Sequence, residues 1–444
     1  MRETALAASA PAPAAPAPSS WSPLQDRVRE PISRLLIQII AIVLATRLVG
    51  SLVATCGQPS VVGEVVAGIL LGPSLLGWFW PGVQSFVFPR ESLGGLNLLS
   101  QLGVCLFMFV VGLELEVGQL QKMAKTAVMV SNAGIVFPFS LGVTMALFLY
   151  SRYAAPGTSF TSFALFMGIS LSITAFPVLA RILKDRGIEK TFLGTTAIAC
   201  AAVDDVTAWI ILAFVIAIAH STSLSSTIFG VGMVFVYVGL MFFVVRPILP
   251  RLLDSGEKEA DTPSVGAVVA VLLLVLTSGL ATELIGVHVL FGAFIAGVIM
   301  PQRHAFREHV AVRLQHFSAL FLLPIFFAFS GLRTSIGLLD KPSAWLVCFI
   351  IIGVATIGKL GGTMLAGRLT GMGWNDAFSL GALMNTRGLV ELVALNIGYD
   401  LGILPPRIFT MMVLMALVTT LLTGPLMNLA GRIKGRAAAN APLA

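Results

Sequence analysis

The chain has 444 residues, of which 57% are hydrophobic and 11% are charged, and its mean hydropathy is +0.94. Soluble domains carry about 25% charged residues, so this composition excludes a water-soluble globular protein. The net charge of +7 would suit a nucleic-acid-binding protein. The Lys and Arg residues instead lie in short loops between apolar segments, which is the pattern that orients membrane helices, and no nucleic-acid partner is expected.

The ends of the chain differ from its middle. Residues 1–30 are rich in Ala and Pro and poor in bulky apolar groups, which predicts a disordered tail. This tail lacks the apolar h-region of a cleaved signal peptide. Residues 31–432 are predicted to form a single transmembrane domain, and residues 433–444 a short cytoplasmic tail.

Apolar runs of about 20 residues, the length that crosses a hydrocarbon core of about 30 Å, follow one another through this domain. They predict an all-α polytopic protein of the inner or plasma membrane with about thirteen transmembrane helices. The predicted spans begin near Ile32, Pro59, Leu96, Thr126, Thr161, Leu193, Thr227, Val265, Val287, Phe317, Ser343, Asp376 and Ile408. The distribution of Lys and Arg places the C-terminus in the cytoplasm and the N-terminus outside. The four cysteines have no CxxC spacing and are predicted to be small core residues.

Thirteen spans permit two inverted six-helix repeats, in which helices one to six match helices eight to thirteen. This pairing matches the fifth span with the twelfth, and both have polar or helix-breaking interiors. The fifth contains Ser172 to Pro177, and the twelfth contains Asn385 to Gly388. Matched interrupted helices predict a binding site near the membrane midplane, because unwound backbone presents carbonyl groups to a cation. The alternative is that Pro177 only kinks a packed helix.

Two adjacent acids, Asp204 and Asp205, lie in the middle of the sixth span. An ionised Asp at this depth costs at least about 2.5 kcal/mol, so intramembrane acids are functional candidates that need a partner. Adjacent helical positions point about 100° apart, so one carboxylate is able to face a water-filled cavity while its neighbour faces another helix. The geometry indicates two different roles.

Two basic residues also lie inside predicted spans. Lys359 in the eleventh span has a depth similar to that of the aspartates, so we expect an ion pair with one of them; the alternatives are a snorkelling lysine or another partner. Arg387 in the twelfth span is expected to pair with Glu391, at i,i+4, in a structural role. His288 lies at a span edge, where a histidine is more often hydrogen-bonded than functional.

Carboxylates bind both protons and hard monovalent cations, so competition at a single site is sufficient for antiport. We therefore predict a transporter rather than an enzyme, with Na⁺ or K⁺ and H⁺ as substrates and no cofactor. Three alternatives remain: an ion channel, a transporter of organic solutes, and an intramembrane aspartyl protease. The protease would place its two acids on different helices so that they share a proton.

The residues resemble the monovalent cation:proton antiporter-2 family, with its sodium/proton-exchanger domain, in a bacterial form without a C-terminal regulatory domain. The resemblance rests on the motifs Pro59 to Glu64 continuing to Pro73, Phe109 to Glu114, Thr174 to Arg181, Val203 to Asp205, His288 to Phe294 and Asn385 to Leu389. It implies thirteen helices, a homodimer embedded in lipid, and a mobile core domain with two crossed discontinuous helices.

The same resemblance implies a role for each site residue. Asp205 would be the principal carrier of the cation and the proton, and Asp204 would pair with Lys359 and exchange that partner for the ion. Thr174 and Ser172, with neighbouring backbone, would complete the cation site. Two acids in this motif imply electrogenic exchange.

Overall fold

The structure is a computed structural model that describes residues 27–28, 30–114, 124–220, 224–253, 265–301 and 304–439. The predicted tail of residues 1–30 therefore lies almost wholly outside the described residues. Within these ranges the chain forms helices and connecting loops. The principal helices, in chain order, are α2 (Pro31–Thr55), α3 (Ser60–Leu71), α4 (Leu76–Phe79), α5 (Pro81–Val87), α6 (Leu93–Glu114), α8 (Ala124–Tyr153), α9 (Phe160–Ser172), α10 (Phe176–Asp185), α11 (Phe192–His220), α12 (Leu224–Leu240), α13 (Arg246–Leu253), α14 (Val265–Ile285), α15 (Val289–Val298), α16 (His304–Phe317), α17 (Leu323–Leu332), α18 (Pro342–Leu369), α19 (Trp374–Met384), α20 (Leu389–Asp400) and α21 (Pro406–Ala439).

Among the described residues, eleven helical segments are long and apolar enough to cross a membrane, and the bent pair α19 and α20 makes a possible twelfth. The predicted ninth span is shorter than expected. It corresponds to α15, which has only ten residues: His288 caps its start, and it ends at Val298, shortly before Pro301. The other predicted starts agree with these segments to within a few residues, apart from two. The segment of the third span begins earlier, at Pro81, because it includes α5, and that of the tenth begins earlier, at His309. The all-α multi-pass fold is confirmed.

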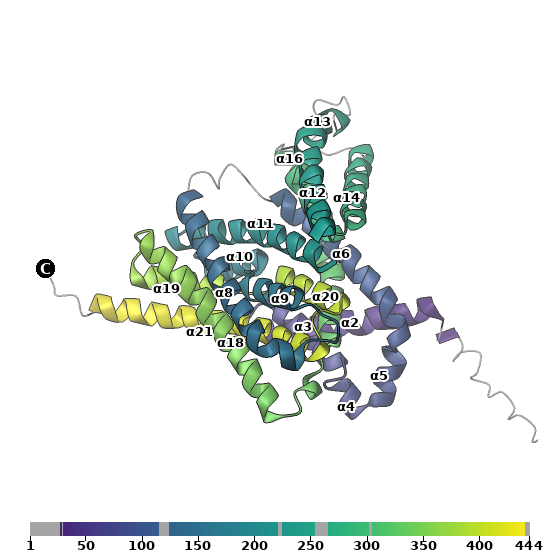
Figure 1. Cartoon of the computed structure of the whole chain (residues 1–444), viewed down its shortest axis with the longest axis horizontal. Helices are drawn as coiled ribbons and strands as arrows, with labels where there is room; N and C mark the ends of the chain where they lie inside the picture. Colours follow the sequence, from purple (N-terminus) through teal and green to yellow (C-terminus); the bar gives the residue numbers. More distant parts are fainter. Residues whose placement is uncertain are drawn as a thin grey trace, which may run out of the picture.

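The helices form two bundles. The site bundle consists of α8, α9, α10, α11, α18, α19, α20 and α21, which pack mainly on one another, and the flanking bundle consists of α2, α3, α6, α12, α14, α15, α16 and α17. Figure 1 shows α18, α19 and the end of α21 on the left, and α12, α14 and α16 together at the upper right. The bundles meet where α11 lies against α12, where α20 lies against α17 and where α21 lies against α3.

Glycines allow two very close helix crossings in the flanking bundle. A Cβ atom on Gly68 of α3 would lie 2.1 Å from the carbonyl oxygen of Ala328 in α17, and one on Gly112 of α6 would lie 2.2 Å from that of Phe294 in α15. These positions therefore accept no side chain without helix displacement. The predicted repeat relates the two crossings, since it matches the second span with the ninth and the third with the tenth.

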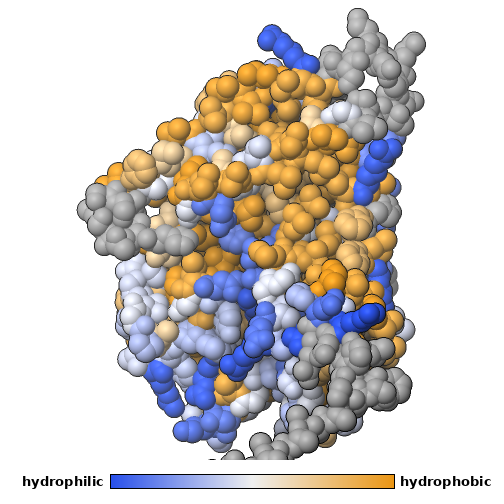
Figure 2. Space-filling view, turned by 90° about the vertical axis from the view of Figure 1, so that its right-hand side faces the viewer, coloured by the Kyte–Doolittle hydropathy of each residue, from blue (hydrophilic) through white to orange (hydrophobic). Residues whose placement is uncertain are grey.

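Large apolar side chains are exposed along several helices, most regularly on α2, where they recur at every fourth position. This stripe consists of Ile32, Leu36, Ile40, Leu44, Leu48 and Leu52, each more than half exposed. Figure 2 shows a broad hydrophobic surface, with hydrophilic residues gathered toward one end of the molecule. Such a surface suits contact with hydrocarbon.

One smaller expectation differs from the structure. Three cysteines are buried as predicted, but Cys56 is exposed because it follows the last turn of α2. Residues 433–439 of the predicted cytoplasmic tail continue α21, which ends at Ala439.

Candidate functional site

Two broken helices cross in the site bundle. The break between α9 and α10 covers residues 173–175, and the break between α19 and α20 covers residues 385–388. The backbone N–H of Ala175 donates to the carbonyl of Thr386 at 3.0 Å, and the Thr174 hydroxyl donates to the carbonyl of Met384 at 2.9 Å. The alternative of a simple kink at Pro177 is wrong, because the backbone of Ile173 is extended and the helix stops there.

The sequence explains where the first break ends. Pro177 lies in the first turn of α10, where its missing N–H costs no helical hydrogen bond and its fixed φ suits a helix start. A helix that ends inside protein leaves its last carbonyl groups without partners, and a helix that begins there leaves its first N–H groups free. The residues around this break supply the missing partners.

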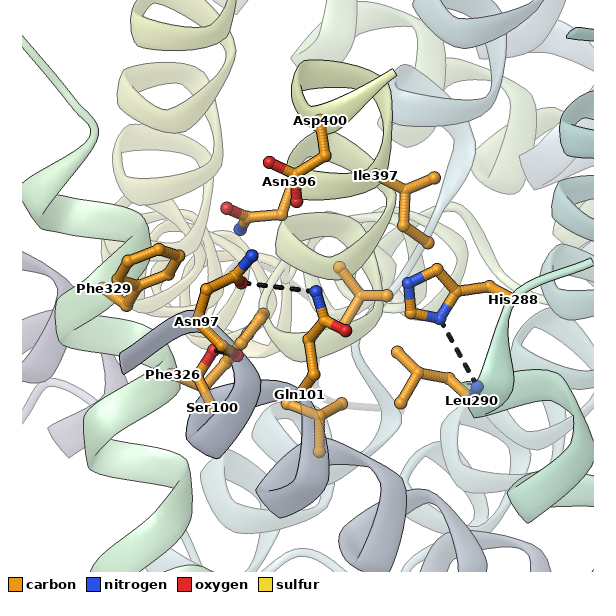
Figure 3. Close-up of a pocket in the computed structure, with 12 residues that line it drawn as sticks. Asn97, Ser100, Gln101, His288, Leu290, Phe326, Phe329, Asn396, Ile397 and Asp400 are labelled. Carbon is orange, nitrogen blue, oxygen red and sulfur yellow. Dashed lines mark hydrogen bonds between the residues drawn. The ribbon is translucent and has the colours of Figure 1, made fainter. Parts of the chain in front are cut away.

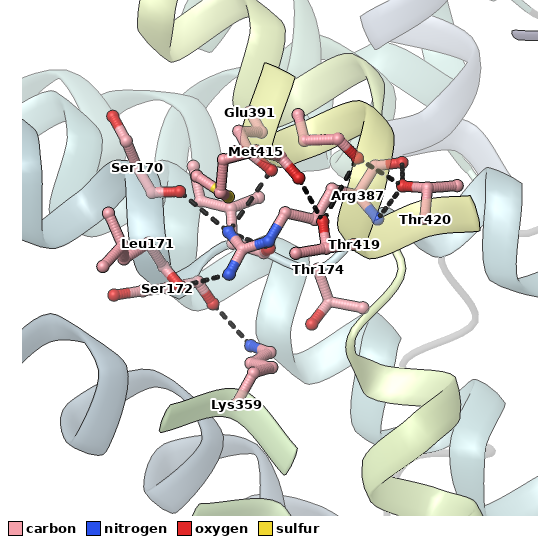
Figure 4. A network of polar contacts seen from close by, with 12 residues as sticks. Ser170, Leu171, Ser172, Thr174, Lys359, Arg387, Glu391, Met415, Thr419 and Thr420 are labelled. Atoms are coloured by element: carbon pink, nitrogen blue, oxygen red, sulfur yellow. Dashed lines mark hydrogen bonds and ion pairs between the residues drawn. The ribbon is translucent and has the colours of Figure 1, made fainter. Parts of the chain in front are cut away.

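Two buried cations satisfy the end of α9. Arg387 donates from Nη1 to the carbonyl of Ser170 at 2.8 Å and from Nη2 to that of Leu171 at 2.7 Å. Lys359 Nζ donates to the carbonyl of Ser172. Figure 4 shows both basic groups directed at this helix end. Positive charge is favourable here, because the carbonyl end of a helix carries a partial negative charge.

Asp204 is held by several donors. Lys359 Nζ lies 3.2 Å from both of its carboxylate oxygens. The backbone N–H of Thr174, freed by the break, donates to Oδ2 at 2.8 Å, and the Ser131 hydroxyl lies 3.5 Å from Oδ1. Both members of the ion pair are fully buried. The expected pairing of Lys359 with one aspartate is present in the structure.

Asp205 has a different environment. Its side chain is 1% exposed, and no side chain among the described residues donates a hydrogen bond to either carboxylate oxygen. The carboxylate faces the backbone N–H of Phe176, at the start of α10, without regular hydrogen-bond geometry. The start of a helix carries partial positive charge, which stabilises an anion only in part. Asp205 therefore retains oxygen lone pairs for a further ligand.

A second ion pair organises the other break. Arg387 Nη1 lies 3.3 Å from Glu391 Oε2, and both side chains are buried. The hydroxyl of Thr420 in α21 accepts from the Arg387 N–H at 2.9 Å and lies 3.0 Å from the Arg387 carbonyl oxygen. The expected i,i+4 pair is present, but the contacts of Arg387 with α9 link the two broken helices as well.

The buried charges of this region do not cancel. Three acids, Asp204, Asp205 and Glu391, face two bases, Lys359 and Arg387, and all five are at most 2% exposed. With every group ionised the sum is one negative charge. Uncompensated charge in a buried site is costly, so binding of a cation or a proton is favourable there.

The remaining predicted residues take local contacts. The Ser172 hydroxyl donates to the carbonyl of Gly168 at 2.6 Å, so only its backbone carbonyl reaches Lys359. His288 accepts from the N–H of Leu290 at 3.4 Å and caps α15, as expected of a hydrogen-bonded histidine. Sequence reasoning missed Ser131 and Thr420. Their only signal was the position of a hydroxyl residue inside an apolar span.

A bundle of apolar helices in which two broken helices cross beside buried acids defines a class, the secondary transporters of small cations. The family model described as "Sodium/hydrogen exchanger, transmembrane" matches residues 39–429. Since this match covers most of the sequence, the chain belongs to the sodium/hydrogen exchanger family. This membership confirms the predicted family and its predicted type of activity, and the family is one of transporters.

Individual relatives agree with this assignment. The chain is 44% identical over 394 residues to the Na(+)/H(+) antiporter NhaS4 of Synechocystis, covering 88% of this chain and 96% of that protein. It is 34% identical to the K(+)/H(+) antiporter 1 of Saccharomyces cerevisiae, covering 93% of this chain but only 48% of that longer protein. The solved structure of the sodium proton antiporter MjNhaP1 from Methanocaldococcus jannaschii superposes with a TM-score of 0.58 at 14% identity, covering 89% of this chain and 98% of that one. That likeness confirms the fold.

Proposed function

We propose that this chain exchanges a monovalent cation, Na⁺ or K⁺, for protons across the membrane, with Asp205 as the principal carrier. The observation that supports the proposal is the contrast between two neighbouring acids. Asp204 is paired with Lys359, whereas the buried carboxylate of Asp205 has no side-chain partner among the described residues. A buried carboxylate in this state binds either a cation or a proton, and one excludes the other.

The surrounding groups complete the proposed site. The Thr174 hydroxyl uses its hydrogen for the Met384 carbonyl, so its oxygen lone pairs remain for a cation. The carbonyl of Ser172 lies at the same helix end and at present accepts from Lys359. In the proposed cycle, Asp204 releases Lys359 when the cation enters, and the site bundle then moves against the flanking bundle to expose the site to the other side.

The proposed exchange is electrogenic. When a single cation enters, Asp205 releases one proton, and Lys359, freed from Asp204, releases a second. Exchange of more than one proton for one cation moves net charge across the membrane, and an imposed membrane potential then drives the exchange.

The named relatives differ in the cation that they carry in their names. One relative is named for Na⁺ and another for K⁺, and the chain spans only about half of the latter. Sodium and potassium differ in the size and number of oxygen ligands that they need. We propose both ions as candidate substrates, to be separated by measurement.

We also propose that the chain works as a homodimer in contact with lipid. The apolar stripe on α2 and exposed residues of α14, such as Leu273, Leu280 and Leu284, give the flanking bundle a surface for a second copy or for acyl chains. A stationary dimer of flanking bundles would leave the site bundles free to move. Crosslinking in native membranes tests this assembly.

Reconstituted vesicles that contain a pH-sensitive dye test the exchange itself. We expect Na⁺ or K⁺ to dissipate an imposed proton gradient, Asp205→Asn to abolish this flux, and a membrane potential to alter its rate. Phe192→Leu, a change of an exposed side chain at the start of α11, is a suitable control. Full exchange by Asp205→Asn, or no exchange with either cation, would contradict the proposal.

A further inference from the structure

An ion pair joins the two bundles far from the aspartates. Arg333, at the end of α17 in the flanking bundle, places Nη1 2.8 Å from Oδ1 of Asp400, the last residue of α20 in the site bundle. The same nitrogen lies 3.1 Å from Oδ1 of Asn396, also in α20. These residues lie on the side that the charge distribution predicts to be external, beside the start of α9, since the Thr158 hydroxyl lies 3.5 Å from the Gly402 carbonyl.

Aromatic rings from both bundles hold the Arg333 guanidinium in place. Its guanidinium carbon lies 4.3 Å from the ring centre of Phe329 in α17 and 5.1 Å from that of Tyr399 in α20, so one aromatic ring comes from each bundle. Planar guanidinium groups stack on aromatic rings and form directed bonds to carboxylates. The Asn396 amide adds a second link, donating to the Ser330 hydroxyl at 2.7 Å.

Behind this contact lies a small polar cavity between α6, α15, α17 and α20. Figure 3 shows Asn97 and Gln101 of α6 facing Asn396 and Asp400 of α20, with His288 at the edge. The cavity has a volume of about 20 Å³, which holds about one water molecule. On the opposite side of the molecule, a cavity of about 480 Å³ separates the turn between α2 and α3 from α10.

We propose that Arg333, Asp400, Asn396 and Ser330 form a latch that closes the external side of the cation pathway and opens once in each transport cycle. Polar contacts join the bundles on this side, whereas a large cavity lies between them on the other, beside a limited contact of α3 with α21. The structure therefore corresponds to a state closed to the outside. In the opposite state α20 moves away from α17, Arg333 loses Asp400, and the small cavity widens into the external entrance.

The latch has chemistry suited to repeated opening. Its charged groups are partly exposed, with 14% of the Arg333 side chain and 36% of the Asp400 side chain accessible. Water therefore solvates both charges when the pair separates, unlike the fully buried pair of Lys359 and Asp204. A partly exposed pair fixes the closed geometry without preventing its release.

The proposal rests on the proposed exchange function, and a labelling experiment tests it without measuring exchange. In a background with the four native cysteines replaced by serine, Ser100→Cys places a thiol on the small cavity, where Ser100 is 1% exposed. We expect an impermeant maleimide added outside to label this thiol about fivefold faster when Asp400→Asn is introduced. The same difference in labelling rate is expected in protein that also carries Asp205→Asn, so the test does not depend on exchange.

The matched control is Asp340→Asn, which removes another external Arg–Asp pair. Asp340 contacts Arg407 of α21 at 2.9 Å and lies next to the start of α18, so this pair is anchored to the site bundle at both ends. We expect no change in labelling. Equal labelling rates for Asp400→Asn and its parent would overturn the latch.

A covalent lock provides the second test. The Asn396 and Ser330 side chains are in direct contact, so Ser330→Cys with Asn396→Cys places two thiols across the bundle interface. We expect oxidation to this disulfide to stop exchange and reduction to restore it. Full exchange with the disulfide formed would show that α17 and α20 stay together throughout the cycle, and would reject the latch.

Discussion

Lys359 Nζ lies 3.2 Å from both carboxylate oxygens of Asp204, while the adjacent Asp205 receives no side-chain hydrogen bond from the described residues. The difference follows from helix geometry, because neighbouring positions on α11 point about 100° apart. One acid faces α18 and the end of α9, and the other faces the start of α10. Of these two identical side chains, Asp204 therefore has a fixed partner, and Asp205 keeps its carboxylate oxygens for a ligand.

The first prediction concerns the stability of the Lys359 and Asp204 pair. Asp204→Asn leaves the Lys359 ammonium buried without its counter-ion, which costs about 3–5 kcal/mol in the free energy of unfolding. The double variant Asp204→Asn with Lys359→Met removes both charges, and we expect it to lose clearly less than the sum of the single variants. Unfolding in a detergent titration measures all four proteins.

This double-mutant cycle isolates the coupling between the two residues. The exposed pair Arg181 and Asp185 on α10 provides the control, with side chains 62% and 59% accessible. Its coupling is expected to be about 0.5 kcal/mol or less. Additive effects at Lys359 and Asp204 would mean that their proximity contributes nothing to stability.

The second prediction concerns Arg387, which satisfies carbonyl groups of Ser170 and Leu171 with two different nitrogens. A lysine ammonium is a single point and does not reach both carbonyls and Glu391 together. We expect Arg387→Lys to reduce the free energy of unfolding by about 2 kcal/mol, since a buried carbonyl without a partner costs about 1–3 kcal/mol. Arg181→Lys, an exposed change in the same bundle, should stay within about 0.5 kcal/mol. Equal stability of the two variants would show that the hydrogen bonds from Arg387 to α9 do not stabilise the contact between the broken helices.

Much of this arrangement was predictable from sequence, for identifiable reasons. Opposite charges at equal depth in apolar spans are costly unless they pair, which predicted the ion pair of Lys359 with an aspartate. Proline and the Asn385 to Gly388 segment marked both helix breaks. The structure brings Asp205, Asp204, Thr174 and Ser172 together, and their role in cation binding stays a prediction.

Other contacts left no trace in the sequence. Arg387 was matched with Glu391 by i,i+4 spacing, yet its main-chain partners belong to α9, more than 200 residues earlier. Backbone carbonyl groups freed by a break have no sequence signature. The short length of α15 was also missed. The apolar sequence continues through Ile299 and Met300, whereas the helix ends at Val298.

The third prediction uses the close crossing of α3 and α17. Gly68→Ala places a methyl group 2.1 Å from the Ala328 carbonyl oxygen, which is backbone and has no free rotation to escape. We expect a loss of about 1–3 kcal/mol in the free energy of unfolding, the range for overpacked interiors. Gly94→Ala in α6 is the control, since no atom lies within 4 Å of the added group. A neutral Gly68→Ala variant would contradict the close approach of the two helices.

The last prediction concerns competition between protons and the cation. If both bind the Asp205 carboxylate, lowering the pH on both sides of the membrane by one unit raises the KM for the cation by up to about tenfold and leaves the maximal rate less affected. His288→Asn tests whether the histidine beside the external cavity causes the effect instead, because asparagine keeps an N-cap acceptor for α15 but does not titrate. We expect the pH dependence of KM to persist in this variant. A KM that is constant with pH, together with a falling maximal rate, would mean that the proton and the cation bind at separate positions. Competition for the Asp205 carboxylate would then be rejected.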